Sequence, residues 1–340
     1  MRFGTCLVLI AVLTLASSVA CDGGDNGIQV ATSSPAASSA TVDGAATTTP
    51  DGAGAWSDGA PMPTPRAEVA SAVIDGKIYV VGGFLANGSN SNVVEAHDPA
   101  TDAWSPVAPM PETLDHPMTA AADGKLYVIG GWRTFGQEAS AAAYAYDPAS
   151  DAWSTVSDMP LARAAGAAVE ASGVIYVVGG VGEEPDVALA YDVAQDAWRR
   201  LAAMPRPREH LAAAAVDGMV YVIGGRWSDT GNVADATVYD PASDTWTQLA
   251  PMPTARGGLT AATLDGRVYV TGGESFGGGS RTFEEHEVYD PAANAWTMLP
   301  PLPTSRHGLA SQGVDGRLYV IAGGETPGLS VSGFVEVFAP

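Results

Sequence analysis

Two arginines, a glutamate and a histidine lie within five positions in the segment RPREH, residues 206–210. Glutamate and histidine are residue types that transfer protons in general acid–base catalysis. An arginine guanidinium can bind a carboxylate through two parallel hydrogen bonds. In an enzyme, Glu209 and His210 would transfer the proton and Arg208 would bind an anionic substrate. No motif fixes these roles, and an exposed, solvated turn explains the same residues, so we assign no catalytic residue outright.

Arginine recurs at the equivalent position of a repeat that runs through the chain. Each copy of the repeat has Met-Pro, or Leu-Pro in the last copy, shortly before this position. A residue that the copies share is often part of the framework, for example by donating hydrogen bonds to carbonyl groups of a neighbouring copy. These arginines therefore have a structural interpretation beside a ligand-binding one. The residues at this position are Arg66, Leu114, Arg163, Arg208, Arg256 and Arg306.

Other chemically active residues of the repeat differ from copy to copy. One group lies beside the arginine position, and a second group follows a recurring pair of glycines. Residues that differ between copies are better candidates for ligand binding than shared ones. Tryptophans in the loops can stack on a sugar ring or a partner side chain, although packing against a neighbouring loop also explains them. The candidate binding residues are Arg66, Glu68, His116, Trp132, Arg163, Arg208, Glu209, His210, Arg226, Trp227, Arg256, Glu274, Arg306 and His307.

Each repeat is predicted to form four antiparallel strands. In the first copy, residues 68–74 are small and apolar, and Asp75-Gly76 is a two-residue hairpin signal. The run KIYVVGG gives a second strand, which is apolar throughout, as expected where both faces are covered. After a variable loop, VVEAHD gives a third strand, DPATDAW a turn and AWSPVAPM a fourth strand. No segment shows a helical period, so the sequence predicts an all-β fold.

The double glycine, the Tyr-Asp or His-Asp pair and the regularly spaced tryptophan of each copy resemble kelch repeats. The resemblance covers nearly all of residues 56–340 and points to bacterial secreted or lipoprotein kelch-repeat β-propellers, in the galactose-oxidase-like central-domain superfamily. It implies six blades of four antiparallel strands. The last copy supplies three strands and ends at EVFAP, whereas residues 55–63 supply an unpaired fourth strand. We predict that this N-terminal strand completes the last blade and closes the ring.

The direction of the strands predicts which face of the propeller binds a ligand. The loops from fourth to first strand and from second to third strand emerge on one face, and the uniform DG and DP turns emerge on the other. We expect binding on the loop face because its sequence varies. In eukaryotic kelch domains, arginines at the entry position line the channel mouth and bind acidic ligands, so the resemblance implies a protein or an anionic glycan as partner. We predict a non-catalytic binding module. The alternative is a carbohydrate-active enzyme such as a sialic-acid mutarotase or epimerase, an activity of some secreted bacterial kelch propellers.

The first 55 residues differ in composition from the repeats. Residues 1–20 fit a signal peptide, with a short apolar run and small residues before Cys21. The segment SSVAC resembles a bacterial lipobox, with Ser18 in place of the usual leucine, and Cys21 would then carry the lipid. Residues 21–55 contain no aromatic and no basic residue, which is typical of a flexible tether. We expect an extracytoplasmic lipoprotein, periplasmic or on the cell surface, that touches the membrane only through its lipid; without lipidation it would be secreted.

Charge and cysteine content exclude several classes of function. A net charge of −22 argues against nucleic-acid binding, which needs clusters of lysine and arginine. Copper-radical sugar oxidases resemble this fold but cross-link a tyrosine to a cysteine, and Cys21 is the last cysteine of the chain. No histidine or cysteine cluster has metal-binding spacing, and the paired aspartates Asp98 and Asp102 are expected to cap a turn. We therefore predict no metal site and no cofactor.

Overall fold

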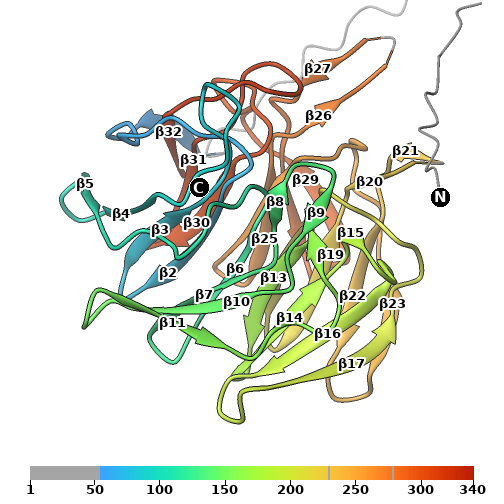
Figure 1. Ribbon diagram of the computed structural model, residues 1–340. Coiled ribbons are helices and arrows are strands. Elements are labelled where there is room, and N and C mark those ends of the chain that lie inside the picture. Colours follow the sequence, from blue (N-terminus) through green and yellow to red (C-terminus); the bar gives the residue numbers. More distant parts are fainter. Residues whose placement is uncertain (1–53, 229, 278) are drawn as a thin grey trace, which may run out of the picture. The chain divides into compact units, whose positions relative to one another are not determined.

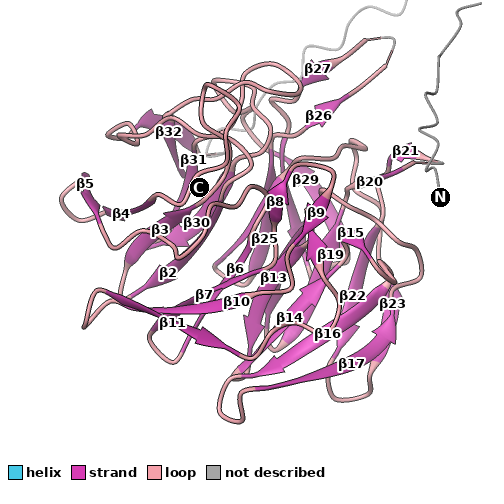
Figure 2. Cartoon of the chain, in the orientation of Figure 1, coloured by secondary structure: helices cyan, strands magenta, loops and turns pink. Residues whose placement is uncertain are grey.

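The computed structural model describes residues 54–340 apart from residues 229 and 278. This part of the chain contains strands and no helix, and so no helix long enough to cross a membrane. Six four-stranded antiparallel sheets follow one another as the blades of a ring (Figure 1 and Figure 2). The predicted six-bladed, all-β propeller is confirmed. The predicted signal peptide, Cys21 and nearly all of the predicted tether lie outside the described residues.

Each of the first five blades is built from one continuous stretch of chain. Blades 1 and 2 consist of β2 (Ala70–Ile74), β3 (Lys77–Val81), β4 (Val94–Asp98), β5 (Ala103–Pro106), β6 (Met118–Ala122), β7 (Lys125–Ile129), β10 (Ala143–Asp147) and β11 (Ala152–Val156). Blades 3 and 4 consist of β13 (Ala167–Ala171), β14 (Val174–Val178), β16 (Val187–Asp192), β17 (Ala197–Ala203), β18 (Ala212–Val216), β19 (Met219–Ile223), β22 (Ala236–Asp240) and β23 (Thr245–Gln248). Blade 5 consists of β24 (Thr260–Leu264), β25 (Arg267–Thr271), β28 (His286–Asp290) and β29 (Ala295–Met298).

The sixth blade joins the two ends of the described chain. It consists of β30 (Ala310–Val314), β31 (Arg317–Ile321), β32 (Val335–Ala339) and β1 (Ala55–Asp58). Strand β1 pairs antiparallel with β32, with Trp56 opposite Phe338. The blue and red ends of the colour scale therefore meet in one sheet (Figure 1). This pairing confirms that the N-terminal strand completes the last blade and covers the edge that β32 would otherwise expose.

Tight turns set the register of the inner hairpins. Asp75 and Gly76 have φ angles of 49° and 75°, which is the left-handed conformation that a type I′ hairpin requires at both central residues. The strand that follows is buried after its first residue, Lys77: Ile78 and Val80 have no exposed surface. This burial explains the continuous apolar run, since neighbouring blades cover both faces of each sheet.

The recurring glycine pair joins each blade to the next. The N–H of Gly83 donates to the carbonyl oxygen of Leu114 at 2.9 Å, and the other five blades repeat this bond. Gly82 has a φ of 65°, and a Cβ there would lie 2.8 Å from the same carbonyl oxygen, so the position favours glycine. In the sixth blade the pair is Ala322 and Gly323, and Ala322 takes the left-handed conformation at a φ of 61°.

A second set of backbone bonds forms a closed ring around the central channel. One residue of each blade, two positions after the arginine position, donates its N–H to the same residue of the preceding blade, at 2.7 to 3.3 Å. All six residues have φ angles between 48° and 66°. The ring lines a channel of about 390 Å³, together with the small residues of the first strands of the blades. The ring residues are Glu68, His116, Ala165, His210, Gly258 and Gly308.

The DP turns bind the outer edges of neighbouring blades together. Asp98 accepts a hydrogen bond from the N–H of Ala100 within its own turn at 3.0 Å. Asp102 accepts one from the N–H of Ala60, in the preceding blade, at 2.9 Å. The indole of Trp104 donates to the carbonyl oxygen of Ala60 at 2.8 Å. The paired aspartates therefore have the turn-capping contacts that the sequence predicts.

Four short two-stranded ladders on the loop face were not predicted from the sequence. Three of them lie within the loops that join second and third strands, and one joins the arginine segment of blade 3 to the loop after its glycine pair. They consist of β8 (Trp132–Thr134) with β9 (Glu138–Ala139), β12 (Arg163–Ala164) with β15 (Val181–Gly182), β20 (Arg226–Trp227) with β21 (Gly231–Asn232), and β26 (Glu274–Ser275) with β27 (Arg281–Thr282).

Candidate functional site

The five arginines of the repeat lie inside the blades. Arg66, Arg163, Arg208, Arg256 and Arg306 are each at most 1% exposed. Burial lowers the pKa of Arg163 and of Arg208 to about 10. A guanidinium in this position cannot reach a ligand in the channel mouth. The structure therefore corrects the expectation that these arginines bind an acidic ligand and supports their framework interpretation.

The contacts of the buried arginines explain why the repeat keeps them. Arg66 donates through Nη1 to the carbonyl oxygens of Gly82 and Val93, both at 2.8 Å. It also forms an ion pair with Glu95 at 2.8 Å. Because the arginine satisfies carbonyl groups beside the glycine pair, it anchors the loop that enters the blade. Equivalent ion pairs join Arg256 to Glu287 and Arg306 to Glu336.

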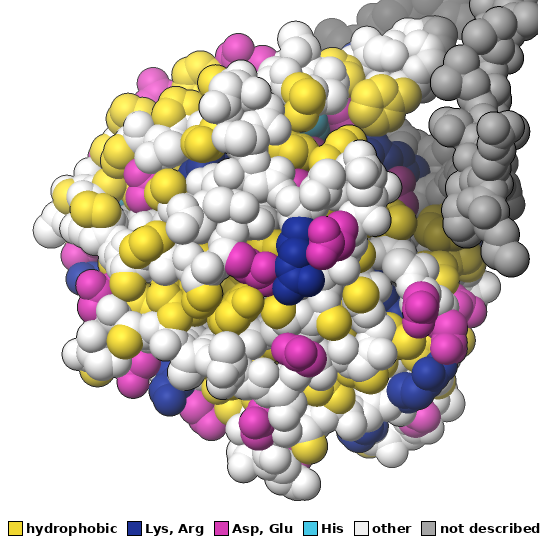
Figure 3. Space-filling model, viewed as in Figure 1, with side chains coloured by type: hydrophobic (Ala, Val, Ile, Leu, Met, Phe, Trp, Pro, Cys, Tyr) yellow, Lys and Arg dark blue, Asp and Glu magenta, His cyan; other side chains and the backbone are white. Residues whose placement is uncertain are grey.

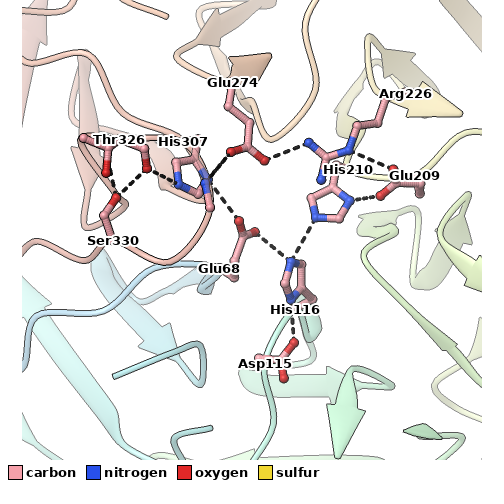
Figure 4. Close-up of polar contacts among 11 residues, drawn as sticks. Glu68, Asp115, His116, Glu209, His210, Arg226, Glu274, His307, Thr326 and Ser330 are labelled. Atoms are coloured by element: carbon pink, nitrogen blue, oxygen red, sulfur yellow. Dashed lines mark hydrogen bonds and ion pairs between the residues drawn. The ribbon is translucent and has the colours of Figure 1, made fainter. Parts of the chain in front are cut away.

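Ionisable side chains from five blades converge beside the ring instead (Figure 4). We call this group the channel-mouth cluster. Each member lies on the ring, directly before it, or directly after a glycine pair, and the cluster combines residues that are far apart in sequence. Eight of its members carry the contacts described below: Glu68, Asp115, His116, Glu209, His210, Arg226, Glu274 and His307.

Glu68 lies between two histidines of the cluster. Its Oε1 lies 3.1 Å from Nδ1 of His307, and its Oε2 lies 3.2 Å from Nε2 of His116. Burial alone would raise the pKa of Glu68, but the neighbouring histidines hold it well below its usual range. Glu68 is therefore an ionised carboxylate that links two sides of the cluster.

Two histidines of the cluster are each backed by an acid. His116 Nδ1 lies 2.5 Å from Oδ1 of Asp115, and His210 Nδ1 contacts the carboxylate of Glu209. The Nε2 atoms of the two rings face each other at 2.9 Å. Burial, together with the charge of Arg226, lowers the pKa of His210 well below its usual value. Burial raises the pKa of Asp115.

His307 has hydrogen-bond acceptors at both ring nitrogens. Nε2 lies 3.1 Å from the carbonyl oxygen of Thr326, and Nδ1 lies 3.1 Å from Glu68 and 3.3 Å from Glu274. Since both nitrogens face oxygen acceptors, the network assigns a proton to each. Burial opposes this charge, but the hydrogen bond and charge of Glu68 and the charge of Glu274 raise the pKa of His307 overall.

Arg226 is the arginine of the cluster, and two carboxylates already bind it. It contacts Glu209 at 2.9 Å and Glu274 at 2.7 Å. Carboxyl groups therefore outnumber cations in the cluster, even without Asp115. This balance favours a cationic or neutral ligand over an anionic one, contrary to the expected positive ring. The acids are Glu68, Asp115, Glu209 and Glu274, and the cations are Arg226 and His307.

Exposed apolar side chains lie beside the cluster. Phe135 is 55% exposed and stacks on the ring of His116, with centroids 5.6 Å apart. Phe276 is 58% exposed and lies against the guanidinium of Arg226, 4.9 Å from the ring centroid. The tryptophans proposed for this role lie elsewhere: Trp132 is buried, which corrects that expectation, and Trp227 is partly buried. The predicted set included neither phenylalanine, although Phe276 follows a glycine pair as other candidates do; Phe135 lies further along a loop whose sequence differs between copies.

The basic residues that reach the surface are dispersed. Figure 3 shows the Lys and Arg side chains of one face as separate spots, without a continuous patch. Arg133, for example, pairs with Glu112 at 2.7 Å and lies 3.6 Å from Glu138. No surface on this view would concentrate positive charge for a polyanion.

The cluster contains half of the binding residues that the sequence predicts. It unites Glu68, His116, Glu209, His210 and Arg226 from the predicted set, together with two further predicted members, Glu274 and His307. Asp115 was not in that set, although its position beside His116 in a varying segment was a usable signal. The prediction of no metal site considered only spacing along the chain, and the structure brings together residues that are far apart in sequence. Ligand atoms of Glu68, His116 and His210 lie within 4.8 Å of one another, but the residues come from three blades.

Comparison with known proteins supports the fold. Residues 115–324 match the family model described as the KLHDC2/KLHL20/DRC7 Kelch-repeats domain, and residues 65–111 match the Kelch motif. Among curated proteins, none matches the chain. The solved structure titled "Structure of YjhT" is similar, with a TM-score of 0.72 and 18% sequence identity, over 81% of this chain and 95% of that chain. At this identity the likeness extends to the fold alone. Because the first family model covers more than half of the sequence, the chain belongs to the kelch-repeat family of β-propellers.

Proposed function

We propose that this kelch propeller binds a neutral carbohydrate at the channel mouth. The observation that carries the proposal is the channel-mouth cluster, because the fold does not need it. Blade 3 closes the same ring with alanines and blade 5 closes it with glycines. Buried ionisable groups are costly to maintain without partners and concentrate at functional sites. The uncharged equivalents are Ala164 and Ala165 in blade 3, and Gly257 and Gly258 in blade 5.

The chemistry of the mouth suits a polyhydroxylated ligand. Carboxylates accept hydrogen bonds from hydroxyl groups, and charge-assisted bonds of this kind are the stronger ones. Exposed aromatic rings pack against the apolar face of a sugar ring. Beside Arg226, Glu209 supplies a carboxylate and Phe276 supplies an aromatic ring. Phe135 supplies a second aromatic ring beside His116. The excess of carboxyl groups would repel an acidic sugar.

The alternative hypothesis, a sialic-acid mutarotase or epimerase, has less support from this geometry. It requires Arg208 to bind the sugar carboxylate beside Glu209 and His210. Arg208 is 1% exposed and donates its hydrogen bonds to Gly224, Asp235 and other groups of its own blade. We therefore propose binding without assigning a reaction, and treat turnover of an acidic sugar as an outcome of the experiment below.

We also propose that residues 1–55 place the propeller outside the cytoplasm on a lipid anchor at Cys21. The support is the sequence: an apolar leader, small residues before the cysteine, and a polar segment after it. A protein on such a tether meets glycans of the cell envelope or its surroundings. Mass spectrometry of the mature N-terminus should find a diacylated cysteine; an unmodified one would contradict the anchor.

Calorimetric titration with sugars tests the proposed binding. The probes are methyl glycosides of glucose, galactose, mannose and N-acetylglucosamine, with sialic acid as the acidic comparator. We expect at least one neutral glycoside to bind and sialic acid not to bind. Phe135→Ala should weaken that binding about fivefold, since a lost aromatic contact costs about 1 kcal/mol.

A matched control is available among the exposed apolar residues. Met298 is 63% exposed at the end of the outer strand β29, so Met298→Ala removes a similar surface away from the mouth. This variant should bind as the wild type does. Equal loss in both variants, or binding and interconversion of sialic acid instead of a neutral sugar, would contradict the proposal.

A further inference from the structure

We propose that Glu68, His116 and His210 form a binding site for a divalent transition-metal ion such as Zn²⁺ or Co²⁺. The proposal stands apart from the proposed sugar binding, because it rests on the positions of three ligand atoms. These atoms are Oε2 of Glu68 and Nε2 of the two histidines. They lie within 4.8 Å of one another and come from blades 1, 2 and 4.

The spacing of the three atoms is close to that of a tetrahedral metal site. Bonds of about 2.0 to 2.1 Å from Zn²⁺ to nitrogen and oxygen ligands place those ligands about 3.3 Å apart. The two Nε2 atoms are 2.9 Å apart, and Nε2 of His116 is 3.2 Å from Oε2 of Glu68. These two separations lie within a few tenths of an ångström of that value, and the third pair of ligand atoms lies within 4.8 Å.

The acids behind the histidines orient both rings for metal binding. Nδ1 of His116 faces Oδ1 of Asp115, and Nδ1 of His210 contacts the carboxylate of Glu209, so each ring presents its Nε2 atom to the cluster. A carboxylate behind a histidine in this way fixes the tautomer that ligates through Nε2. The Nε2 atoms of the two rings lie 2.9 Å apart, and Nε2 of His116 also lies 3.2 Å from Oε2 of Glu68. A proton or a metal ion among these three atoms removes the repulsion between their lone pairs.

A second group of possible ligands does not meet these conditions. Glu68, Glu274 and His307 also have ligand atoms within 4.8 Å of one another. However, Nε2 of His307 faces the carbonyl oxygen of Thr326, and its Nδ1 faces the two carboxylates. His307 therefore serves as the cation of that group itself. This leaves Oε1 of Glu68 held by His307 and Oε2 directed toward His116.

The surroundings also suit a bound cation. The acids of the cluster outnumber its cations, so the local field attracts a positive ion. Glu68, His116 and His210 all line the channel of about 390 Å³, which offers a path for an ion and space for a water molecule as fourth ligand. Three protein ligands with one open position are typical of sites that bind a metal and an exchangeable group.

The rival explanation is a proton shared between the two histidines. One imidazolium could donate from Nε2 to the other ring, and the same 2.9 Å distance would result. Titration with metal separates the two explanations, because a shared proton gives no stoichiometric site for the ion.

The experiment titrates the chelator-treated, purified protein with Co²⁺ and follows visible absorption, with Zn²⁺ added as a competitor. The test variants are His116→Gly and His210→Gly, which give the ring the residue that blades 5 and 6 already have there. The control is His97→Tyr, because blades 2 to 5 have tyrosine at the position of this buried histidine outside the cluster. Glu209→Gln tests the positioning of His210 without removing a ligand.

We expect one Co²⁺ per chain with a tetrahedral spectrum, displaced by Zn²⁺, in the wild type and in His97→Tyr. Each glycine variant should bind at least about 100-fold more weakly, and Glu209→Gln about 10- to 100-fold more weakly. X-ray absorption of the Zn²⁺-loaded wild type should show two imidazoles and a carboxylate as ligands of the metal. This measurement does not depend on whether any variant folds. Absence of a stoichiometric site, or equal binding by the glycine variants, would overturn the proposal in favour of the shared proton.

Discussion

Two positions of one segment, residues 208 and 210, differ in how often the other blades repeat their residue type and in where the side chain lies. Four other blades also have an arginine at the position of Arg208. Arg208 is buried, and it donates its hydrogen bonds to groups of its own blade. His210, two residues later, occurs in two blades and faces a cluster at the channel mouth. In this repeat, a shared charged residue is part of the framework. Charged residues that differ between blades assemble the candidate site.

The first prediction tests the framework half of this comparison and has the largest expected effect. Arg256→Leu removes one partner of the buried ion pair with Glu287, at 2.6 Å, and leaves the carboxylate without its cation. We expect the free energy of unfolding to fall by about 3 to 5 kcal/mol. Urea denaturation, monitored by tryptophan fluorescence, measures this change in the free energy of unfolding.

A paired substitution sharpens this test. Blade 2 has Leu114 at the arginine position, and blade 3 has Leu189 at the glutamate position, both fully buried. The double variant Arg256→Leu/Glu287→Leu combines these two apolar solutions and should recover most of the lost stability, since no charge is left unpaired. If the double variant were as unstable as the single one, the ion pair would not be the source of the effect.

The second prediction concerns acid stability at the outer edge of the blades, and its effect is smaller. Asp151, Asp196 and Asp244 each accept hydrogen bonds from a tyrosine hydroxyl and from a backbone N–H of the preceding blade, and these bonds lower the pKa of each carboxyl group below its usual value. A carboxyl group with a lowered pKa in the folded state stabilises the fold above its unfolded pKa. That contribution is lost as the pH falls through the folded pKa.

Blade 5 supplies the natural control for the acid effect. Asn294 accepts the same two bonds, from Ala250 N–H at 2.9 Å and from the hydroxyl of Tyr289 at 2.8 Å, without titrating. Changing the three aspartates to asparagine should therefore leave the melting temperature near its wild-type value at pH 7 and flatten its decline between about pH 5 and pH 3. Melting curves that decline equally in both proteins would show that these turns do not contribute.

The fold could be predicted from the sequence because its determinants recur. The glycine pair, the DG hairpin and the tryptophan each appear in nearly every copy. The last copy has three strands, so a fourth was expected from the N-terminal segment with Trp56, which pairs with Phe338. The short ladders of the loop face, such as β20 with β21, were not predictable in this way, since their loops differ between copies.

The candidate site was predicted only in part, for reasons of geometry. Variation between copies identified Glu68, His116 and His210, but residue spacing along the chain does not reveal that three blades meet at one point. The burial of Arg66 depends on Glu95 in the third strand of the same blade, a pairing that no local pattern marks. Phe135 was not predicted, because it lies in a loop whose sequence differs from blade to blade.

The most direct test of the account replaces part of the cluster with the residues of blade 3. The variant Glu209→Ala/His210→Ala/Arg226→Val gives blade 4 the side chains of Ala164, Ala165 and Val181. The account predicts a free energy of unfolding within about 1 kcal/mol of the wild type, because an apolar replacement of buried charges is often neutral and His307 remains as a cation beside Glu274. It also predicts loss of sugar and metal binding. Destabilisation as large as that of Arg256→Leu, or unchanged binding, would contradict the claim that the cluster serves a function and not the fold.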